Sequence, residues 1–359
     1  MIRLIWEMNQ SIESLIRSWD GEEVLVRFDR SSGAWIVFAI HSTYLGPATG
    51  GTRMKYYPDL AAAVGDALRL AEGMTYKFAV AGLDRGGGKA VIALPENFDR
   101  SIRDDLLRRY GALIHQLGGL YQTGPDVGTS AEDMDVVSQT GAPYVFCRTP
   151  ENGGAGDSSS PTAAGVHAGI RAVGDALFEN PSLKERSILV QGAGSVGSRL
   201  VDLLLADGAR VLLCDVDSAR VQRYLDVPGV SVIDPEAAFR TPCDVFAPCA
   251  LGGVLNSDTI PRLQCRGVAG AANNQLAEES DAERLHARGI LYAPDYIVNI
   301  GGALAIPGIE LEGWSIGEAE ERVRQKVEEV LNLVFRSAVR DNVTTNEAAR
   351  RVARSRLDI

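Results

Sequence analysis

The hydrophobic and polar positions in the first part of the chain predict both strands and helices. Residues 24–40 carry β-branched and aromatic residues on both sides of a Ser-Ser-Gly turn, which predicts two strands. Ala, Leu and Val recur at helical spacing over 59–75, and 101–118 is also amphipathic, so we expect a helix in each. Residues 78–93 are small and apolar around a Gly-rich turn, which predicts a strand, a turn and a second strand.

The second part alternates more regularly. Residues 151–161 are rich in Gly, Ser and Pro, which predicts a loop near a domain boundary. A long helical pattern follows, then a strand–helix–strand unit, then short apolar runs between helical stretches, and finally two amphipathic helices. The ranges are 162–178, then 187–191, 195–206 and 210–215, then 244–247, 267–270 and 290–293, and lastly 315–338 and 346–357. This alternation is typical of an α/β fold with a doubly wound parallel sheet.

Composition narrows the class of protein. A length of 359 residues favours two domains. The net charge of −11 argues against a nucleic-acid partner, and no window approaches the roughly 20 apolar residues of a membrane span. The five cysteines are odd in number and have no metal-ligand spacing. They predict a reducing, cytoplasmic location, without a bound metal or a disulfide framework.

A glycine-rich motif lies between the first strand and helix of the strand–helix–strand unit. Residues 187–197 read SILVQGAGSVG. In this pattern Gly192 makes the tight turn, Gly194 lets the backbone approach a pyrophosphate, and Gly197 lets the helix pack on the strand. A glycine turn of this kind also occurs by chance, so the surrounding strand and helix carry the prediction.

Three further positions belong to this motif. Ser195 and Val196 open the helix, whose free N–H groups would face the phosphates. Asp215 ends the next strand, 23 residues after Gly192. An acid there accepts hydrogen bonds from the adenosine ribose and repels a 2′-phosphate. The motif therefore predicts NAD as the cofactor, in preference to NADP.

The lysines indicate a second site. The chain has 31 arginines and only five lysines, so arginine is its ordinary surface cation. Lys77 and Lys89 both lie in apolar or Gly-rich sequence. Partial desolvation there lowers the pKa of a lysine and allows it to act as a general base. Asp126 lies between Pro and Gly, and by itself would be only a turn residue.

Taken together, the motifs give the chain a resemblance. It is similar to the amino acid dehydrogenase family that includes the glutamate, leucine, valine and phenylalanine enzymes, and its length fits the short branch. The matching segments lie in family order over nearly the whole chain. They are LGPATGGTR (45–53), LRLAEGMTYKFAVAGLDRGGGKAVI (68–92), TGPDVGTSAEDMD (123–135), PENGGAGDSSSPTAAGV (150–166), QGAGSVG (191–197), CDVFAPCALGGVLN (243–256), GAANNQLAE (270–278) and APDYIVNIGGALAI (293–306).

The resemblance implies roles for the residues near the two lysines. Lys89 would be the catalytic lysine, and Asp126 would assist proton transfer at the amino group. Lys77 would bind the substrate α-carboxylate with the backbone at Gly50 and Gly51. The implied reaction is the NAD-dependent, reversible oxidative deamination of an L-amino acid to a 2-oxo acid and ammonia.

The resemblance also implies a fold and further binding residues. Asn274 and Asn299 would hold the substrate and the nicotinamide ribose, and Thr162 would bind the nicotinamide amide. An N-terminal α/β substrate domain, 1–148, would be completed by a C-terminal helix, 340–359, and a Rossmann NAD domain would span 149–339. The active site would lie in the cleft between them, and the chain would form a homo-oligomer.

Three positions bear on which amino acid is used. Thr49, Gly124 and Ala303 stand where leucine dehydrogenases tend to carry Leu, Ala and Val. These smaller residues favour a larger substrate, so we predict phenylalanine or another bulky aromatic amino acid. Segments such as PENGGAGDSS look more like valine dehydrogenases, so leucine or valine is the alternative. Ile300, where the family usually has Ala, would reshape the pocket.

Two other functions compete with this hypothesis. An NAD-binding regulator without catalysis would not need Lys77, Lys89 and Asp126, all of which are present. A hydroxy acid dehydrogenase commonly uses a histidine as its acid and base. The four histidines, at 41, 115, 167 and 286, lie outside Gly-rich or acid-paired sequence. The sequence therefore favours the amino acid dehydrogenase.

Overall fold

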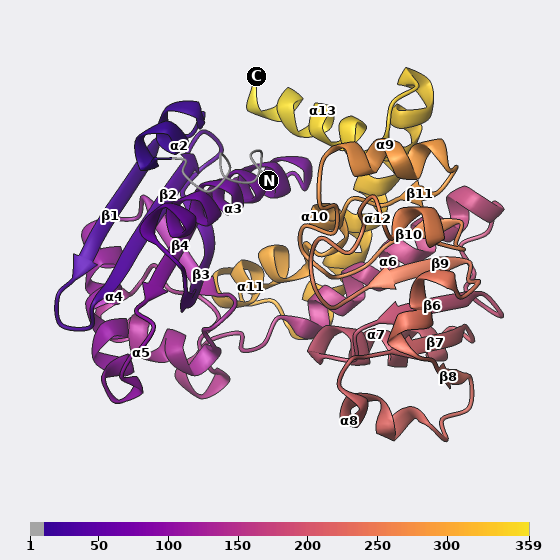
Figure 1. The fold of residues 1–359 in the computed structure, drawn as a ribbon, viewed down its shortest axis with the longest axis horizontal. Helices are drawn as coiled ribbons and strands as arrows, with labels where there is room; N and C mark the ends of the chain where they lie inside the picture. The colour runs from indigo at the N-terminus through magenta and orange to yellow at the C-terminus, as the bar shows by residue number, and fades with distance from the viewer. Residues whose placement is uncertain (1–10, 359) are drawn as a thin grey trace, which may run out of the picture. The chain divides into compact units, whose positions relative to one another are not determined.

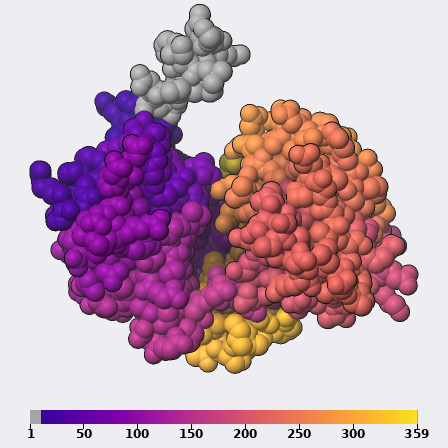
Figure 2. Space-filling model, turned by 60° about the horizontal axis from the view of Figure 1, so that its bottom comes forward, coloured from indigo at the N-terminus to yellow at the C-terminus, as the bar shows by residue number. Residues whose placement is uncertain are grey.

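The computed structural model describes residues 11–358 and divides the chain into two compact units. The first contains the chain as far as Asp157 and again from Arg356, and the second is Ser158–Ser355. Figure 1 traces the elements of each unit, and Figure 2 shows their surfaces, with the first unit mainly indigo and magenta. The division between Asp157 and Ser158 lies inside the loop predicted at 151–161, whereas the predicted domain boundary lies between 148 and 149.

The C-terminal helix also departs from the prediction that 340–359 completes the first domain. Helix α13, Thr345–Leu357, groups with the second unit as far as Ser355. Within the second unit the Thr345 hydroxyl donates to the carbonyl of Tyr292. Only the end of the chain belongs to the first unit, because the Arg356 guanidinium donates to the Leu83 carbonyl at 2.9 Å and to Asp84 at 2.7 Å.

The first unit is built on a five-stranded sheet with the order β1-β2-β4-β3-β5. The strands are β1 Glu23–Asp29, β2 Ala34–Ser42, β3 Ala48–Tyr56, β4 Gly86–Leu94 and β5 Tyr121–Pro125. The hairpin of β1 and β2 confirms the two strands predicted in 24–40. β2 pairs antiparallel with β4, whereas β3 is parallel to both β4 and β5. β3 therefore lies between the strands that carry Lys89 and Gly124.

Helices cover both faces of this sheet. The first face packs its apolar side chains, including Val37 and Val91, against α3, Leu60–Val80. The second face, including Phe38 and Ile92, packs against α4, Arg103–Gln116, and α5, Ala131–Gly141. A short helix, α2 Ile12–Ser18, lies against α3. The predicted helices at 59–75 and 101–118 are confirmed.

The first strand predicted in 78–93 is wrong. Phe78, Ala79 and Val80 instead form the last turn of α3, and all three are buried. A short apolar run buried on every side has neither a helical nor a strand period, so periodicity cannot distinguish the two. The helix ends before Gly82, whose φ is +73°, and the chain then enters β4, the second predicted strand.

The second unit contains a six-stranded, wholly parallel sheet with the order β11-β10-β9-β6-β7-β8. The strands are β6 Ser187–Gln191, β7 Arg210–Cys214, β8 Val230–Val232, β9 Val245–Pro248, β10 Gly267–Val268 and β11 Leu291–Tyr292. This sheet confirms the doubly wound fold. Strand order reverses between β6 and β9, and such a reversal is where open α/β sheets bind their ligands.

The helices of this unit agree with the predicted pattern. Helices α6 and α7 pack against each other beside the sheet, and α12 packs on α6. Ser315 caps α12, because its hydroxyl accepts the N–H of Glu318 at 3.2 Å. The helices are α6 Ser159–Phe178, α7 Ser195–Ala206, α8 Ser218–Val221, α9 Ser280–Ala287, α10 Asp295–Val298, α11 Gly301–Glu312 and α12 Ile316–Asp341. In the described part of the chain, none is long and apolar enough to cross a membrane.

Candidate functional site

The glycine motif forms a tight turn between β6 and α7. Gly192 has a φ of +105°, and a Cβ there would approach the Cys249 carbonyl to 3.0 Å. A Cβ on Gly197 would lie 1.9 Å from the Gly192 carbonyl oxygen, so the helix packs directly on the turn. At Gly194 a Cβ would meet nothing nearer than the Arg220 guanidinium at 3.7 Å. The backbone at Gly194 is therefore open to a ligand.

The helix that follows this turn is suited to bind an anion. Gly194 is its N-cap and supplies no side-chain hydrogen bond, so no side chain of its own caps the first turn that Ser195 and Val196 begin. Unpaired N–H groups at a helix N-terminus attract phosphate through their partial positive charge.

Asp215 lies beside the turn, directly after β7. Its Oδ2 accepts the N–H of Ala193 at 2.7 Å, and its Oδ1 accepts the N–H of Asp217 at 2.9 Å. The Arg220 guanidinium is 3.8 Å from Oδ2. The acid is thus held against the glycine turn, where the ribose of a dinucleotide would lie. This arrangement fits NAD, in agreement with the sequence prediction.

Two of the other predicted binding residues of the second unit lie at the start of helices that pack together. Thr162 is in the first turn of α6, and a Cβ on Gly301, at the start of α11, would lie 2.5 Å from its Cα. Ala303, in the first turn of α11, is half-buried. Ile300 is only 1% exposed, so its side chain is taken up by the interior of this unit.

The two asparagines are held by a shared loop. Asn299 is 5% exposed, and its amide donates to the Ala271 carbonyl at 3.1 Å and to Asn273 Oδ1 at 2.8 Å. Asn274 has a left-handed φ of +52°, and its backbone N–H donates to Asp295 Oδ2 at 2.7 Å. Asn299 is thus fixed inside the fold, whereas the exposed Asn274 presents its side chain to solvent.

In the first unit the structure brings Lys89 and Asp126 together. Lys89 lies in the middle of β4 and Asp126 directly follows β5. The Lys89 ammonium is 2.8 Å from Asp126 Oδ2, and the lysine is only 6% exposed. Burial lowers the pKa of Lys89 and outweighs the opposing charge of Asp126. Burial opposes ionisation of Asp126, but the charges of Lys89 and Arg53 lower its pKa to about 2.

Sequence reasoning missed Arg53, Asp66 and Tyr57, which extend this pair. Arg53 Nε donates to the same Oδ2 of Asp126 at 2.9 Å, and its Nη1 donates to Asp66 Oδ2 at 3.0 Å. The Tyr57 hydroxyl donates to Asp66 Oδ2 at 2.6 Å. Arg53 ends the GGTR segment, but nothing in the sequence indicates that its partners lie on a helix and on a distant loop.

The glycines at 50 and 51 allow β3 to approach its neighbours. A Cβ on Gly50 would lie 1.8 Å from the Gly88 carbonyl oxygen, and one on Gly51 would lie 2.6 Å from the Pro125 carbonyl oxygen. The Gly50 carbonyl accepts a hydrogen bond of 2.6 Å from the Tyr121 hydroxyl, which helps to hold β3 in place. Lys77 lies in the last turn of α3 and is half-buried.

The two predicted specificity positions of the first unit, Thr49 and Gly124, lie near each other on neighbouring strands. Thr49 on β3 pairs with Gln122 on β5, two residues before Gly124. The Arg85 guanidinium donates to Gln122 Oε1 at 2.6 Å and to the Thr49 hydroxyl at 3.4 Å. A Cβ on Gly124 would make ordinary contacts, with Cys147 Sγ nearest at 3.5 Å. Arg85 and Gln122, which the sequence did not indicate, therefore add polar groups at this place.

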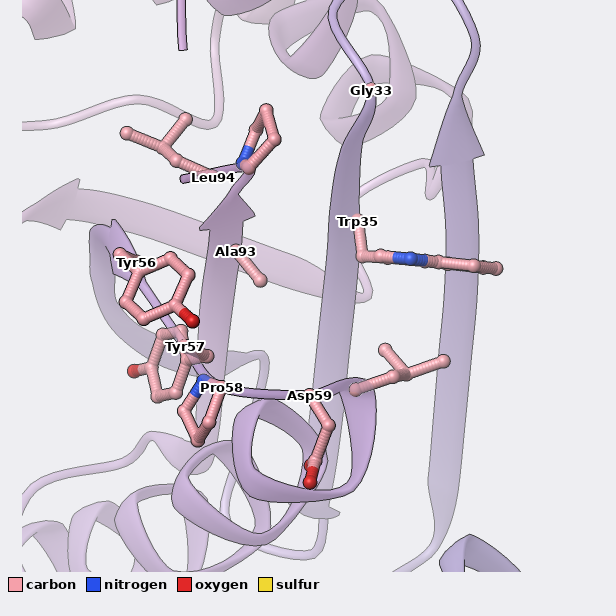
Figure 3. A pocket seen from close by; sticks show the side chains of 10 residues that line it. Gly33, Trp35, Tyr56, Tyr57, Pro58, Asp59, Ala93 and Leu94 are labelled. Carbon is pink, nitrogen blue, oxygen red and sulfur yellow. The ribbon is translucent and has the colours of Figure 1, made fainter. Parts of the chain in front are cut away.

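A pocket of about 260 Å³ lies elsewhere in the first unit (Figure 3). It is formed where β3 and β4 end, and Figure 3 shows the side chains of Tyr56, Tyr57 and Asp59 around it. Its lining includes none of the predicted site residues. Tyr57 nevertheless links the wall of this pocket to Asp66, and through it to the ion-paired cluster at Lys89.

The doubly wound sheet, its glycine turn and Asp215, which is hydrogen-bonded to that turn, define an NAD-dependent oxidoreductase. The comparisons with known proteins give the family. Residues 24–142 match the family profile described as Glu/Leu/Phe/Val dehydrogenase, dimerisation domain. Residues 214–358 match the profile described as Glutamate/Leucine/Phenylalanine/Valine dehydrogenase.

Individual relatives match over nearly their full length. A valine dehydrogenase of Streptomyces coelicolor is 46% identical over 94% of this chain and 92% of its own. A leucine dehydrogenase of Geobacillus stearothermophilus is 41% identical over 96% and 92%. The crystal structure of L-tryptophan dehydrogenase from Nostoc punctiforme has a TM-score of 0.81 at 38% identity, covering 96% and 97%.

The chain belongs to the Glu/Leu/Phe/Val dehydrogenase family, and it is an amino acid dehydrogenase. This confirms the family resemblance and the class of enzyme predicted from the motifs. The aromatic preference is not confirmed, because the sequence relatives named above act on valine and leucine. The comparisons agree better with the branched-chain alternative.

Proposed function

We propose that this enzyme catalyses the reversible oxidative deamination of a branched-chain L-amino acid, valine or leucine, to the 2-oxo acid and ammonia. The observation that carries the chemistry is the buried Lys89–Asp126 pair, 2.8 Å apart, beside the glycines of β3. The named activities of the valine and leucine dehydrogenases, at 46% and 41% identity, support the choice of substrate.

The first unit would bind the amino acid through opposite charges. Lys77, with the backbone of Gly50 and Gly51, would hold the α-carboxylate. Asp126 would face the ammonium group, and its depressed pKa keeps it an anion at any working pH. Ammonium and carboxylate would then each meet a group of opposite charge, which fixes the direction of the Cα–H bond.

The second unit would hold the cofactor. Gly192, Gly194 and Gly197 would cradle the pyrophosphate, Ser195 and Val196 would offer backbone N–H groups, and Asp215 would bind the adenosine ribose. Thr162, Asn274 and Asn299 would contact the nicotinamide end. When bound, NAD accepts the hydride that leaves Cα. Such placement of both reactants accounts for much of the rate in reactions of this kind.

Lys89 and Asp126 would move the protons. Asp126 relays a proton from the substrate ammonium to solvent, so that hydride loss from Cα leaves an iminium ion. Neutral Lys89 then removes a proton from the water that attacks Cα. Asp126 relays that proton from the Lys89 ammonium to the nitrogen, and Lys89 takes the hydroxyl proton as the C–N bond breaks, which releases ammonia and the 2-oxo acid. Water supplies the carbonyl oxygen, and one amino acid yields one reduced cofactor.

An aromatic amino acid is the second candidate substrate. Thr49, Gly124 and Ala303 are small, and the tryptophan dehydrogenase of known structure is 38% identical. A non-catalytic regulator is a remote third candidate, and the intact Lys89–Asp126 pair speaks against it.

The test is NADH formation at alkaline pH with L-valine, L-leucine, L-phenylalanine, L-tryptophan and L-glutamate, with ammonia release measured in parallel. We expect valine or leucine to have the highest kcat/KM. A lead by phenylalanine or tryptophan would overturn the substrate in favour of the second candidate. NADH binding without turnover of any amino acid would overturn the catalytic proposal.

We also infer that the enzyme is a cytoplasmic homo-oligomer. The profile matched by 24–142 is described as a dimerisation domain, which supports self-association. None of the five cysteines, all within the described residues, forms a disulfide, which fits a reducing compartment. Light scattering of the purified chain would test the assembly, and a monomeric mass at working concentration would contradict it.

A further inference from the structure

Asp126 has two cationic partners, and both bind the same oxygen atom. Lys89 Nζ lies 2.8 Å and Arg53 Nε 2.9 Å from Asp126 Oδ2. The side chains are largely buried, with exposures of 7% for Lys89, 14% for Arg53 and 16% for Asp126. A buried carboxylate without a cation is strongly destabilising, so a lone Lys89–Asp126 pair would hold the lysine proton tightly.

Arg53 removes this constraint because its charge is permanent. An arginine stays protonated in proteins, so Asp126 keeps a partner after Lys89 has lost its proton. Arg53 is itself held by Asp66 at 3.0 Å, and Asp66 also binds Arg69 at 2.7 Å. The two arginines and two aspartates balance in charge without Lys89. The cluster is therefore neutral when the lysine is neutral.

We propose that Arg53 is a positioning residue that keeps Asp126 paired in both protonation states of Lys89 and so lets the lysine release its proton. This inference rests on the proposed role of Lys89 as the base and deepens it. In that role Arg53 contacts neither the substrate nor the Lys89 amine. It acts on Lys89 through Asp126. The geometry also gives Asp66 a function, which is to hold the Arg53 guanidinium in reach of Asp126.

The other charged groups agree with this assignment. Burial is the largest influence on Lys89 and lowers its pKa, Asp126 and Asp66 act to raise it, and Arg53 acts to lower it. The other titratable groups on the elements packed over this face are His41 on β2 and Glu72, Tyr76 and Lys77 on α3. His41 is hydrogen-bonded to Thr75 and Asp20.

The test compares two variants with opposite expected shifts. Arg53→Met leaves Lys89 as the cation bound to Asp126, so the acidic limb of the pH profile of kcat/KM should move up by at least one pH unit. At neutral pH the rate should fall at least tenfold. Asp66→Asn keeps an amide oxygen that can accept the Arg53 N–H, so Arg53 stays in reach of Asp126, but it removes an anion that favours the charged lysine. The same limb should therefore move to lower pH.

A matched control is Arg109→Met. Arg109 makes two hydrogen bonds of 2.8 Å to Asp29, so this variant also breaks an arginine–aspartate pair of the first unit, one that includes neither Lys89 nor Asp126. This variant should leave the acidic limb of the pH profile of kcat/KM unchanged. Arg53→Lys, which keeps a cation, should recover part of the shift.

A second measurement is independent of turnover. Trace acetylation with acetic anhydride at a series of pH values, read at the Lys89 peptide by mass spectrometry, titrates the lysine in the full chain. We expect its midpoint to rise in Arg53→Met and to fall in Asp66→Asn. Unchanged midpoints in both folded variants, with only a uniform loss of kcat, would overturn the inference. If no amino acid is turned over, the proposed function fails, but the titration of Lys89 still tests whether Arg53 controls its protonation.

Discussion

The carboxylate of Asp215 and the backbone N–H of Ala193 are joined by a 2.7 Å hydrogen bond, so the acid after β7 and the glycine turn after β6 form one structural unit. Asp215 Oδ1 is fixed in turn by the N–H of Asp217. The acid is therefore held in place without a ligand, and in the proposed cofactor site its contribution to binding would not be offset by the ordering of a flexible side chain.

Replacement of Asp215 by Ala should weaken NADH binding by about ten- to a hundredfold, the range expected for a lost hydrogen bond to a charged group. Discrimination against NADPH should fall, because the repelling charge is gone. NADH and NADPH fluorescence titrations measure both effects. Asp217→Ala makes the same charge change at an exposed position two residues away, and equal losses in the two variants would contradict a specific role.

Replacement of Lys89 by Met should reduce kcat by about 10²–10⁴-fold, the usual contribution of a general acid or base. The fold should survive, because Arg53 still pairs with Asp126 at 2.9 Å. NADH binding, which we assign to the second unit, should change little. Stopped-flow turnover and an NADH titration on the same preparation check this. Activity within tenfold of the unmodified enzyme would exclude Lys89 as the base.

Replacement of Gly124 by Ala should narrow substrate choice without loss of the fold. The new methyl group would meet Cys147 Sγ at an ordinary 3.5 Å. If it enters the side-chain pocket, kcat/KM should fall more for leucine than for valine, by about 10- to 200-fold for one methylene. Paired assays of the two substrates measure the ratio. If the ratio of kcat/KM for leucine to that for valine is the same in the variant and in the unmodified enzyme, Gly124 does not determine specificity.

Replacement of Gly50 on β3 and of Gly73 on α3 by Ala should change thermal stability in opposite directions. Gly50→Ala places a Cβ 1.8 Å from the Gly88 carbonyl oxygen, so β3 and β4 must separate and the melting temperature should fall by several degrees. A Cβ on Gly73, which is exposed in the middle of α3, meets nothing within 4 Å. Gly73→Ala should stabilise the helix by about 0.5–1 kcal/mol. Thermal unfolding of both variants tests the packing, and equal effects would contradict it.

The acid stability of the first unit should depend on Asp126. Its pKa is lowered to about 2 in the folded chain, whereas an unfolded aspartate titrates near 3.9. The folded state thus binds fewer protons, so the stabilisation is complete above about pH 4 and is lost as pH falls through 2. The contribution is on the order of 2 kcal/mol.

Asp126→Asn lacks this titration. We therefore expect the melting temperature of the unmodified enzyme to decline toward that of the variant between about pH 4 and pH 2. A constant difference between the two proteins across this range would show that Asp126 has no depressed pKa. Calorimetry in buffers of matched ionic strength makes the comparison.

The sequence by itself determined the features that depend on local pattern. The glycine turn at 192–197 and the acid at 215 were predicted together, because a strand, a turn and a helix of one unit are adjacent in the chain. The resemblance of the ordered motifs added a shared role in proton transfer for Lys89 and Asp126, and the structure then placed Lys89, on β4, in contact with Asp126, directly after β5. The helices at 101–118, 162–178 and 315–338 followed from their amphipathic period.

Tertiary structure decided what depends on contacts between distant segments. The run Phe78–Val80 became helix, because burial on all sides left no period to distinguish helix from strand. Strand β3 lies between β4, the next strand along the chain, and β5, the one after it, and the pairing of β3 with β5 brings Arg53 to Asp126. The alternation of residues within one strand does not identify the strand that pairs with it, so this contact could not be read from local pattern.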